Sequence, residues 1–322
     1  MPRMQDLLAN NVHVQSKGAI DENAQAIEIT DLSFDYGGRN PVPILSNVSL
    51  TIERGSRVLL VGANGAGKTT LLRILAGKRL VKGSVRVFGH DAFLDAPKGV
   101  TYLGTEWAGN PIVKADLSVG YLLQSMGGDR FAERRDRLLE VLEVDVDWHM
   151  HQRSDGERRR VQLVMGLMAP WNLLLMDEVT VDLDVLVRSQ LLQYLKEETE
   201  QRGATILYAT HIFDGKCLSQ WPTHLAHMAD RTVLSCNSTE TSPEYNLFKQ
   251  YHKEQQLLDS PLMSLCIDWL RRDKERLLRA RQAQGSERRL SETDKPKTRW
   301  DELSEDMKTY GDKYYNYWSG QP

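Results

Sequence analysis

The sequence has few of the features that mark secreted, disulfide-bonded or membrane-spanning proteins. Its 322 residues contain three cysteines, Cys217, Cys236 and Cys266. Their number and spacing predict no disulfide framework or cysteine-based zinc site and suit a reducing compartment. No apolar run approaches the roughly 18 residues that span a bilayer, and the N-terminus lacks the apolar core of a secretory signal. We therefore expect an intracellular, soluble protein with no membrane insertion.

The chain also lacks a strong excess of charge of either sign. The formal net charge is −3, and acidic and basic residues are interleaved throughout. This balance gives no global electrostatic reason to bind nucleic acid. Hydrophobic residues at 41% and charged residues at 26% are ordinary for a globular protein. We expect no direct nucleic-acid partner.

What the sequence does contain is a buried strand followed by a glycine-rich turn and a helix, over residues 58–76. Gly62, Gly67, Lys68 and Thr69 fit the G-x-x-x-x-G-K-[ST] spacing. Such a turn aims successive backbone N–H groups at one anion, and the positive end of the helix adds to the attraction. The alternative is a glycine-rich turn that binds nothing. The predicted phosphate-binding residues are Gly62, Asn64, Gly65, Ala66, Gly67, Lys68, Thr69 and Thr70.

The surrounding pattern alternates strands with helices, which favours a mostly parallel α/β core over residues 26–240. A helical block at about residues 106–170 interrupts it. We expect strands at 26–36, 47–52, 57–61, 84–88, 99–103, 172–176, 204–209, 224–229 and 231–236. We expect helices at 68–76, 119–126, 131–144, 156–168 and 185–201.

The two ends of the chain differ from this core. Residues 1–25 are polar and aperiodic, which predicts a flexible N-terminal arm. Residues 241–322 are predicted to form a helical C-terminal extension, with a helix at 261–281 and a polar linker at 282–298. The final segment is rich in Trp and Tyr. We favour its packing on the chain's own core over its docking on a partner.

Two acids end a second buried strand, at residues 173–178. Because unpaired charge on a buried strand is costly, we expect both acids to be functional. Asp177 is placed to hold the shell of a Mg²⁺ ion, and Glu178 is placed to polarise an attacking water. His211 follows the strand at 206–209, so we expect it at the same edge of the sheet.

A further segment, Arg153-Ser-Asp-Gly-Glu157, lies at the start of a predicted helix. Ser154 and Gly156, together with the amides of the helix N-terminus, could hold another phosphate. The alternative is a capped, solvated basic helix.

Taken together, these motifs resemble the ATP-binding cassette (ABC) ATPases over roughly residues 26–236. The resemblance implies a P-loop NTPase fold of ABC type, with a RecA-like mixed sheet core, an antiparallel β subdomain and an inserted helical subdomain. It also implies ATP and Mg²⁺, and a head-to-tail homodimer with two ATPs between one subunit's phosphate loop and the other's signature segment. By this resemblance, Tyr36 stacks on the adenine of ATP. Ser154, Gly156 and Glu157 belong to the signature, and Asp184 belongs to the dimer-contact loop. Asp177 is the metal residue, Glu178 is the catalytic acid and His211 is the switch histidine.

Two motifs depart from the family pattern. The metal-contacting glutamine of the family falls within residues 102–107, where Thr105 or Glu106 takes its place; Thr105 is our assignment to the metal. In the signature, Arg153 replaces an apolar residue and Asp155 replaces a glycine. A carboxylate beside a γ-phosphate is repulsive unless it points away or neighbouring arginines offset it.

The motif variants are similar to the membrane-free eukaryotic ABC subfamily I, whose yeast member is associated with the carbon-catabolite-repression/Not complex of transcription and mRNA turnover. The resemblance implies a cytoplasmic or nuclear ATPase whose ATP-dependent dimerisation switches its interactions with protein partners, in transcription or mRNA metabolism. One alternative is the detached ATP-binding subunit of a membrane ABC transporter. Another is a scaffold that binds ATP with little turnover.

Overall fold

The computed structural model describes residues 23–37, 42–104, 115–213, 216–257 and 259–287. Contacts divide the chain into two units, residues 1–273 and 274–322. The described part of the second unit is the C-terminal part of one helix, α9 (Pro261–Glu287). Within the described residues, no helix is both long enough and apolar enough to cross a membrane.

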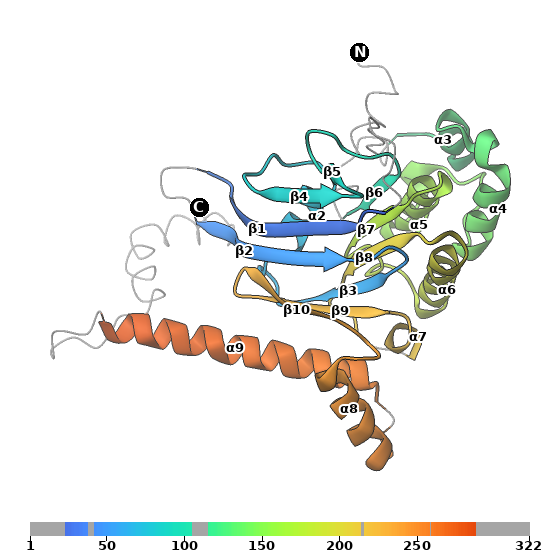
Figure 1. The fold of residues 1–322 in the computed structure, drawn as a ribbon. Helices are drawn as coiled ribbons and strands as arrows, with labels where there is room; N and C mark the ends of the chain where they lie inside the picture. Colours follow the sequence, from blue (N-terminus) through green and yellow to red (C-terminus); the bar gives the residue numbers. More distant parts are fainter. Residues whose placement is uncertain (1–22, 38–41, 105–114, 214–215, 258, 288–322) are drawn as a thin grey trace, which may run out of the picture. The chain divides into compact units, whose positions relative to one another are not determined.

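A six-stranded sheet lies at the centre of the first unit (Figure 1). Its strand order is β10-β9-β3-β8-β7-β6; the strands from β9 to β6 pair in parallel, and β10 pairs antiparallel with β9. These strands are β3 (Arg57–Val61), β6 (Val100–Leu103), β7 (Leu173–Asp177), β8 (Thr205–Ala209), β9 (His224–Ala229) and β10 (Thr232–Ser238).

A second, antiparallel sheet of four strands has the order β2-β1-β4-β5. Its strands are β1 (Ile27–Asp35), β2 (Pro43–Ile52), β4 (Ser84–Val87) and β5 (His90–Asp91). The predicted combination of a mixed sheet with an antiparallel β subdomain is confirmed.

Two hydrophobic cores flank the central sheet because side chains alternate between its faces. Along β3, Val58 and Leu60 join the core shared with β1, β2 and the helix α2 (Lys68–Leu75). Leu59 and Val61 join the core under the other helices. Both faces are covered, so the strand reads as a continuous apolar run, as the sequence predicted.

The predicted helical insertion is also confirmed. In Figure 1, α3, α4 and α5 gather at one side of the molecule, coloured green. The helices after α2 are α3 (Val119–Ser125), α4 (Ala132–Val141), α5 (Asp155–Met168), α6 (Val185–Arg202), α7 (Lys216–Ser219), α8 (Pro243–Glu254) and α9, with short 3₁₀ segments η3 (Gly128–Phe131) and η4 (Met150–Gln152).

The C-terminal part differs from the prediction in two ways. Helix α8 was not predicted, and α9 runs to Glu287, so the polar linker expected from Gln282 is wrong for residues 282–287. Residues 241–273 belong to the first unit, while the domain boundaries expected from the sequence stay a prediction. The aromatic tail and almost all of the N-terminal arm lie outside the described residues.

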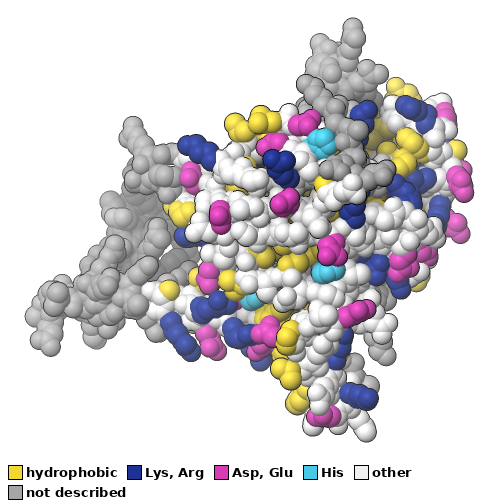
Figure 2. All heavy atoms as spheres, in the orientation of Figure 1, with side chains coloured by type: hydrophobic (Ala, Val, Ile, Leu, Met, Phe, Trp, Pro, Cys, Tyr) yellow, Lys and Arg dark blue, Asp and Glu magenta, His cyan; other side chains and the backbone are white. Residues whose placement is uncertain are grey.

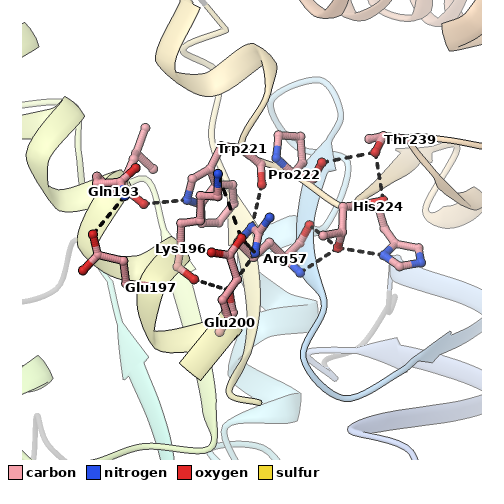
Figure 3. Close-up of polar contacts among 12 residues, drawn as sticks. Arg57, Gln193, Lys196, Glu197, Glu200, Trp221, Pro222, His224 and Thr239 are labelled. Carbon is pink, nitrogen blue, oxygen red and sulfur yellow. Dashed lines mark hydrogen bonds and ion pairs between the residues drawn. The ribbon is translucent and has the colours of Figure 1, made fainter. Parts of the chain in front are cut away.

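A buried arginine at the start of β3 joins three parts of the core (Figure 3). Arg57 donates through Nε to the carbonyl oxygen of Trp221 at 2.7 Å and through Nη1 to the Thr199 hydroxyl at 2.8 Å. Glu200 lies 3.5 Å from the same guanidinium. Burial lowers the pKa of Arg57, and the charge of Glu200 opposes that effect. This cluster fixes α6 and the chain before β9 against the strand that leads to the phosphate loop.

Candidate functional site

The phosphate loop connects β3 to α2 and folds around its own lysine. The Nζ atom of Lys68 donates to the carbonyl oxygen of Gly62 at 2.7 Å and to that of Ala63 at 3.1 Å. Burial lowers the pKa of Lys68, and the nearby carboxylates of Glu178 and Asp177 oppose the shift. A buried ammonium group at a helix N-terminus is suited to binding phosphate.

Two glycines of the loop are required by their surroundings. A Cβ atom at Gly62 would lie 2.3 Å from the carbonyl oxygen of Met228 in β9. Gly67 has φ +106° and is the N-cap of α2, and a Cβ there would lie 2.7 Å from Leu45. Gly67 provides no side chain to cap the helix, so the N–H groups of the first turn stay available to an anion.

Asp177 ends β7 beside the hydroxyl of Thr69. The Thr69 hydroxyl donates to Oδ1 of Asp177, and the Tyr102 hydroxyl donates to Oδ2, each at 3.2 Å. Burial raises the pKa of Asp177; these two hydrogen bonds oppose the rise, and the charge of Glu178 adds to it. A buried carboxylate paired with a hydroxyl is the oxygen donor set that Mg²⁺ prefers, so the residues present fit this ion.

Glu178 has a left-handed backbone, with φ +54°, which is uncommon for a non-glycine residue. Its N–H donates to the carbonyl oxygen of Ala209 at 2.9 Å, which holds this conformation at the end of the strand. Oε1 of Glu178 lies 3.1 Å from Nδ1 of His211. Strain of this kind is typical of functional positions, and here it accompanies a carboxylate that lines a cavity.

That cavity has a volume of about 420 Å³. At its outer end the Tyr36 hydroxyl lies 3.1 Å from Oγ1 of Thr70, and the Arg79 guanidinium lies 5.5 Å from the centre of the Tyr36 ring. Tyr36 is 53% exposed, so its ring is accessible to a planar ligand. The lining residues are Tyr36, Ile44, Asn64, Gly65, Gly67, Lys68, Thr69, Thr70, Asp177 and Glu178.

The signature segment forms a self-contained cap at the start of α5. The hydroxyl of Ser154 accepts from the Glu157 N–H at 3.3 Å, and a Glu157 carboxylate oxygen accepts from the Ser154 N–H at 2.8 Å. This is a capping box. Arg153 lies 3.4 Å from Glu157, and Arg158 lies 3.1 Å from the exposed carboxylate of Asp155. The acidic substitution at Asp155 is therefore offset by a neighbouring arginine.

Asp184 of the dimer-contact loop is the N-cap of α6. Its Oδ1 accepts from the Val187 N–H at 3.0 Å, and its Oδ2 accepts from Nη2 of Arg160 at 2.5 Å. Arg160 belongs to α5, so the contact joins the dimer-contact loop to the signature helix. The loop and the helix also approach each other closely at Gly156, where an added Cβ atom would lie 2.9 Å from the carbonyl oxygen of Asp182.

The predicted site residues therefore fall into two groups. Most of the phosphate-loop residues, Tyr36 and the two acids line the cavity, and Gly62, Ala66 and His211 adjoin its walls. Ser154, Gly156, Glu157 and Asp184 lie outside the described lining, and Thr105 lies outside the described residues. Sequence reasoning missed Ile44 and Tyr102. Ile44 lies at the start of β2, ahead of the strand expected at residues 47–52, and the only signal for Tyr102 was its position near the end of the strand expected at residues 99–103.

Comparison with known proteins identifies the family. Residues 45–181 match the family described as ABC transporter. CCR4-associated factor 16 of Saccharomyces cerevisiae is 40% identical over 279 residues, or 78% of this chain and 96% of that protein. ABC transporter I family member 21 of Arabidopsis thaliana is 43% identical over 260 residues, or 76% of this chain and 86% of that protein.

A solved dimeric ATP-binding cassette bound to ADP and Pi aligns with a TM-score of 0.57 at 20% identity, over 66% of this chain and 98% of that one. This likeness shows the fold. The chain belongs to the ATP-binding cassette family and is an ABC-type ATP hydrolase.

Proposed function

We propose that the chain binds ATP with Mg²⁺ in the cavity beside Lys68, and that two copies then close head to tail over two nucleotides. The observation that carries this proposal is the separation of the predicted site residues into two groups. The described cavity lining contains the phosphate loop and both acids, but no residue of the signature segment 153–157. A second copy of the chain would supply that segment.

Each residue of the cavity has a defined role in this proposal. Lys68 and the α2 amides bind the phosphates, and Thr69 and Asp177 would hold Mg²⁺, which would neutralise the charge of the phosphates. Glu178 accepts a proton from a water whose oxygen bonds to the γ-phosphorus, while the bond from that phosphorus to the bridging oxygen breaks and ADP leaves. His211 orients the Glu178 carboxylate through the 3.1 Å contact.

An apolar surface beside the dimer-contact loop supports association with a second protein surface. Val181, Val185 and Leu186 are 43%, 70% and 61% exposed, respectively. They flank Asp184, which is bonded to the signature helix through Arg160. Exposed apolar clusters on soluble proteins commonly mark interaction sites, and this one lies where head-to-tail closure would cover it.

We further propose that closure switches binding to protein partners in a regulatory complex of transcription or mRNA metabolism, in the cytoplasm or nucleus. The support is the name of the yeast relative, a CCR4-associated factor, at 40% identity. Figure 2 shows basic and acidic side chains interspersed on the visible face, an arrangement that favours protein over nucleic-acid partners.

Two alternatives have weaker support. The Arabidopsis relative is named as an ABC transporter I family member, which favours a detached transporter subunit; co-purification with a polytopic membrane protein would establish it. A scaffold with little turnover is disfavoured by the contact between His211 and Glu178.

The proposal is tested by sedimentation velocity of the Glu178→Gln protein with and without Mg-ATP. This change keeps the side-chain volume but removes the base, so ATP stays bound and a closed dimer accumulates. The matched control carries Lys68→Ala as well and is expected to remain monomeric. If the protein stays monomeric in every nucleotide state while ATP is demonstrably bound, the head-to-tail dimer is wrong. The hypothesis of a scaffold that binds ATP with little turnover then takes its place.

A further inference from the structure

Three side chains meet on the surface of the helical subdomain, away from the nucleotide cavity. Nδ1 of His149 lies 2.5 Å from Oδ1 of Asp116, and Nδ1 of His151 lies 3.2 Å from the same oxygen. One ligand atom from each residue falls within 4.8 Å of the other two. Among the described residues, no other group of three or more His, Cys, Asp or Glu side chains converges in this way.

The backbone holds these three residues in place. The Val119 N–H donates to the carbonyl oxygen of Trp148 at 2.8 Å, and the Met150 N–H donates to that of Leu117 at 3.0 Å. These bonds form a short antiparallel bridge next to Asp116. Met150, the first residue of the 3₁₀ segment η4, is fully buried, whereas His149 and His151 on either side of it are exposed.

The signature helix braces the same segment from the other side. Arg158 of α5 donates through Nε to the carbonyl oxygen of Met150 at 3.0 Å and through Nη2 to that of His151 at 3.2 Å. The backbone that carries the two imidazoles is therefore tied to α3 on one side and to α5 on the other. This arrangement lowers the ordering cost of binding a ligand there.

The donor set matches a divalent transition ion. Two imidazole nitrogens and one carboxylate oxygen are typical ligands of zinc, and three protein ligands leave further positions for water. One carboxylate oxygen of Asp116 faces both imidazoles, at 2.5 Å from His149 and 3.2 Å from His151.

We propose that Asp116, His149 and His151 form a surface site for a divalent transition-metal ion, with Zn²⁺ as the preferred occupant. The site is independent of the proposed ATP and Mg²⁺ chemistry. His151 lies three residues before Ser154, so an ion held here would stiffen the segment that enters the signature. The thiols of Cys236 and Cys266 are poor competitors for Zn²⁺, since burial raises the pKa of Cys236 to about 11 and also raises that of Cys266.

The test is calorimetric titration of Zn²⁺ into the full-length, tag-free, nucleotide-free protein after removal of bound metal. Wild type is expected to bind one Zn²⁺ at this site, and His149→Gln, His151→Gln and Asp116→Asn are each expected to weaken it by about tenfold or more. The matched control is His90→Gln, because His90 lies 2.7 Å from Asp95 in a comparable surface pair outside the three-residue group. This control is expected to bind as wild type does.

Substitution with Co²⁺ gives a second readout, since its visible ligand-field bands report imidazole nitrogen coordination and should disappear in the His149→Gln/His151→Gln protein. Circular dichroism of the metal-free variants should match wild type, because all three side chains are exposed. Two results would overturn the proposal. One is a wild-type protein that binds no Zn²⁺ in the titration, and the other is a Zn²⁺ isotherm unchanged in the doubly substituted variant.

Discussion

The imidazole Nε2 of His227 lies 2.9 Å from Oδ2 of Asp273, and both side chains are buried. His227 pairs with Val61 at the end of β3, whereas Asp273 belongs to α9. The Trp269 ring stacks on the imidazole with centroids 4.5 Å apart, and its Nε1 donates to Glu244 of α8 at 2.8 Å. A buried polar contact thus joins the C-terminal helices to the strand next to the phosphate loop.

Loss of this contact should destabilise the first unit. We expect Asp273→Ala to lower the free energy of unfolding by about 2–4 kcal/mol, because it leaves a buried imidazole without its partner. The control is Asp268→Ala, which removes an exposed ion pair with Arg272 at 2.7 Å and should cost about 0–0.5 kcal/mol. Urea unfolding followed by circular dichroism measures both. Equal midpoints for the two variants would show that the buried pair contributes nothing beyond a surface ion pair.

Tyr102 is expected to tune the pH dependence of ATP hydrolysis. Its hydroxyl donates to Asp177 and so opposes the rise in the pKa of that carboxyl group that burial causes. In Tyr102→Phe the pKa of Asp177 should rise further, so Asp177 becomes protonated at a higher pH. The acidic limb of the pH–rate profile should then move to higher pH. Tyr121→Phe, at an exposed position on α3, is the control; a profile unchanged in Tyr102→Phe would contradict the assigned role of Asp177.

The contact between the helical subdomain and α6 should be acid-labile. Arg134 of α4 donates to Glu198 at 2.6 Å, and Arg202 donates to the other carboxylate oxygen. Burial acts to raise the pKa of Glu198, but these two arginines outweigh it and hold the pKa below its ordinary value. The stabilisation is therefore present above the unfolded pKa, about 4.3, and is lost as pH falls through the lower folded pKa.

Glu198→Gln removes this pH-dependent contribution. We expect it to lower the free energy of unfolding at pH 7 by about 1–3 kcal/mol, and the difference from wild type should shrink as pH falls below the unfolded pKa of about 4.3. Thermal unfolding over a pH series measures the effect, with Glu133→Gln at an exposed position of α4 as the control. A difference that stays constant as pH falls would rule out a charge effect at Glu198.

Two glycines of the phosphate loop, Gly62 and Gly65, should tolerate alanine differently. Gly62→Ala places a Cβ 2.3 Å from the Met228 carbonyl oxygen, a main-chain atom that cannot rotate away. We expect a loss of about 1–3 kcal/mol in stability and weaker nucleotide binding. A Cβ atom at Gly65 would meet nothing within 4 Å, so the only strain in Gly65→Ala comes from the backbone φ of +82°. This strain costs about 1 kcal/mol. Thermal unfolding and titration with a fluorescent ATP analogue compare the two, and the reverse order would contradict the described packing.

The local elements of the fold were predictable because each is encoded by neighbouring residues. The apolar run at residues 58–61, preceded by Arg57, predicted β3 with its observed bounds, since a strand covered on both faces reads as a nearly continuous apolar run. The order of glycines, lysine and threonine that follows likewise dictates the loop backbone.

Helix α8, which was not predicted, also carried a local signal in its sequence. Helix α8 begins with Ser242 as N-cap, which accepts from the Tyr245 N–H, and with Pro243 in its first turn. The same Ser-Pro start did predict α9 at Pro261. The start of β2 at Pro43, four residues before the predicted strand, had no such signal, because it depends on pairing with β1.

The sequence by itself determined the phosphate loop, the paired acids Asp177 and Glu178, and the alternation of strands and helices, because each depends on residues close together in the chain. Only the tertiary structure decided which distant groups meet. Tyr102 reaches Asp177 because β6 pairs with β7 in register, and His227 meets Asp273 because residues 261–273 of α9 belong to the same unit and pack on its core. Such contacts follow from strand order and side-chain packing, which no local pattern specifies.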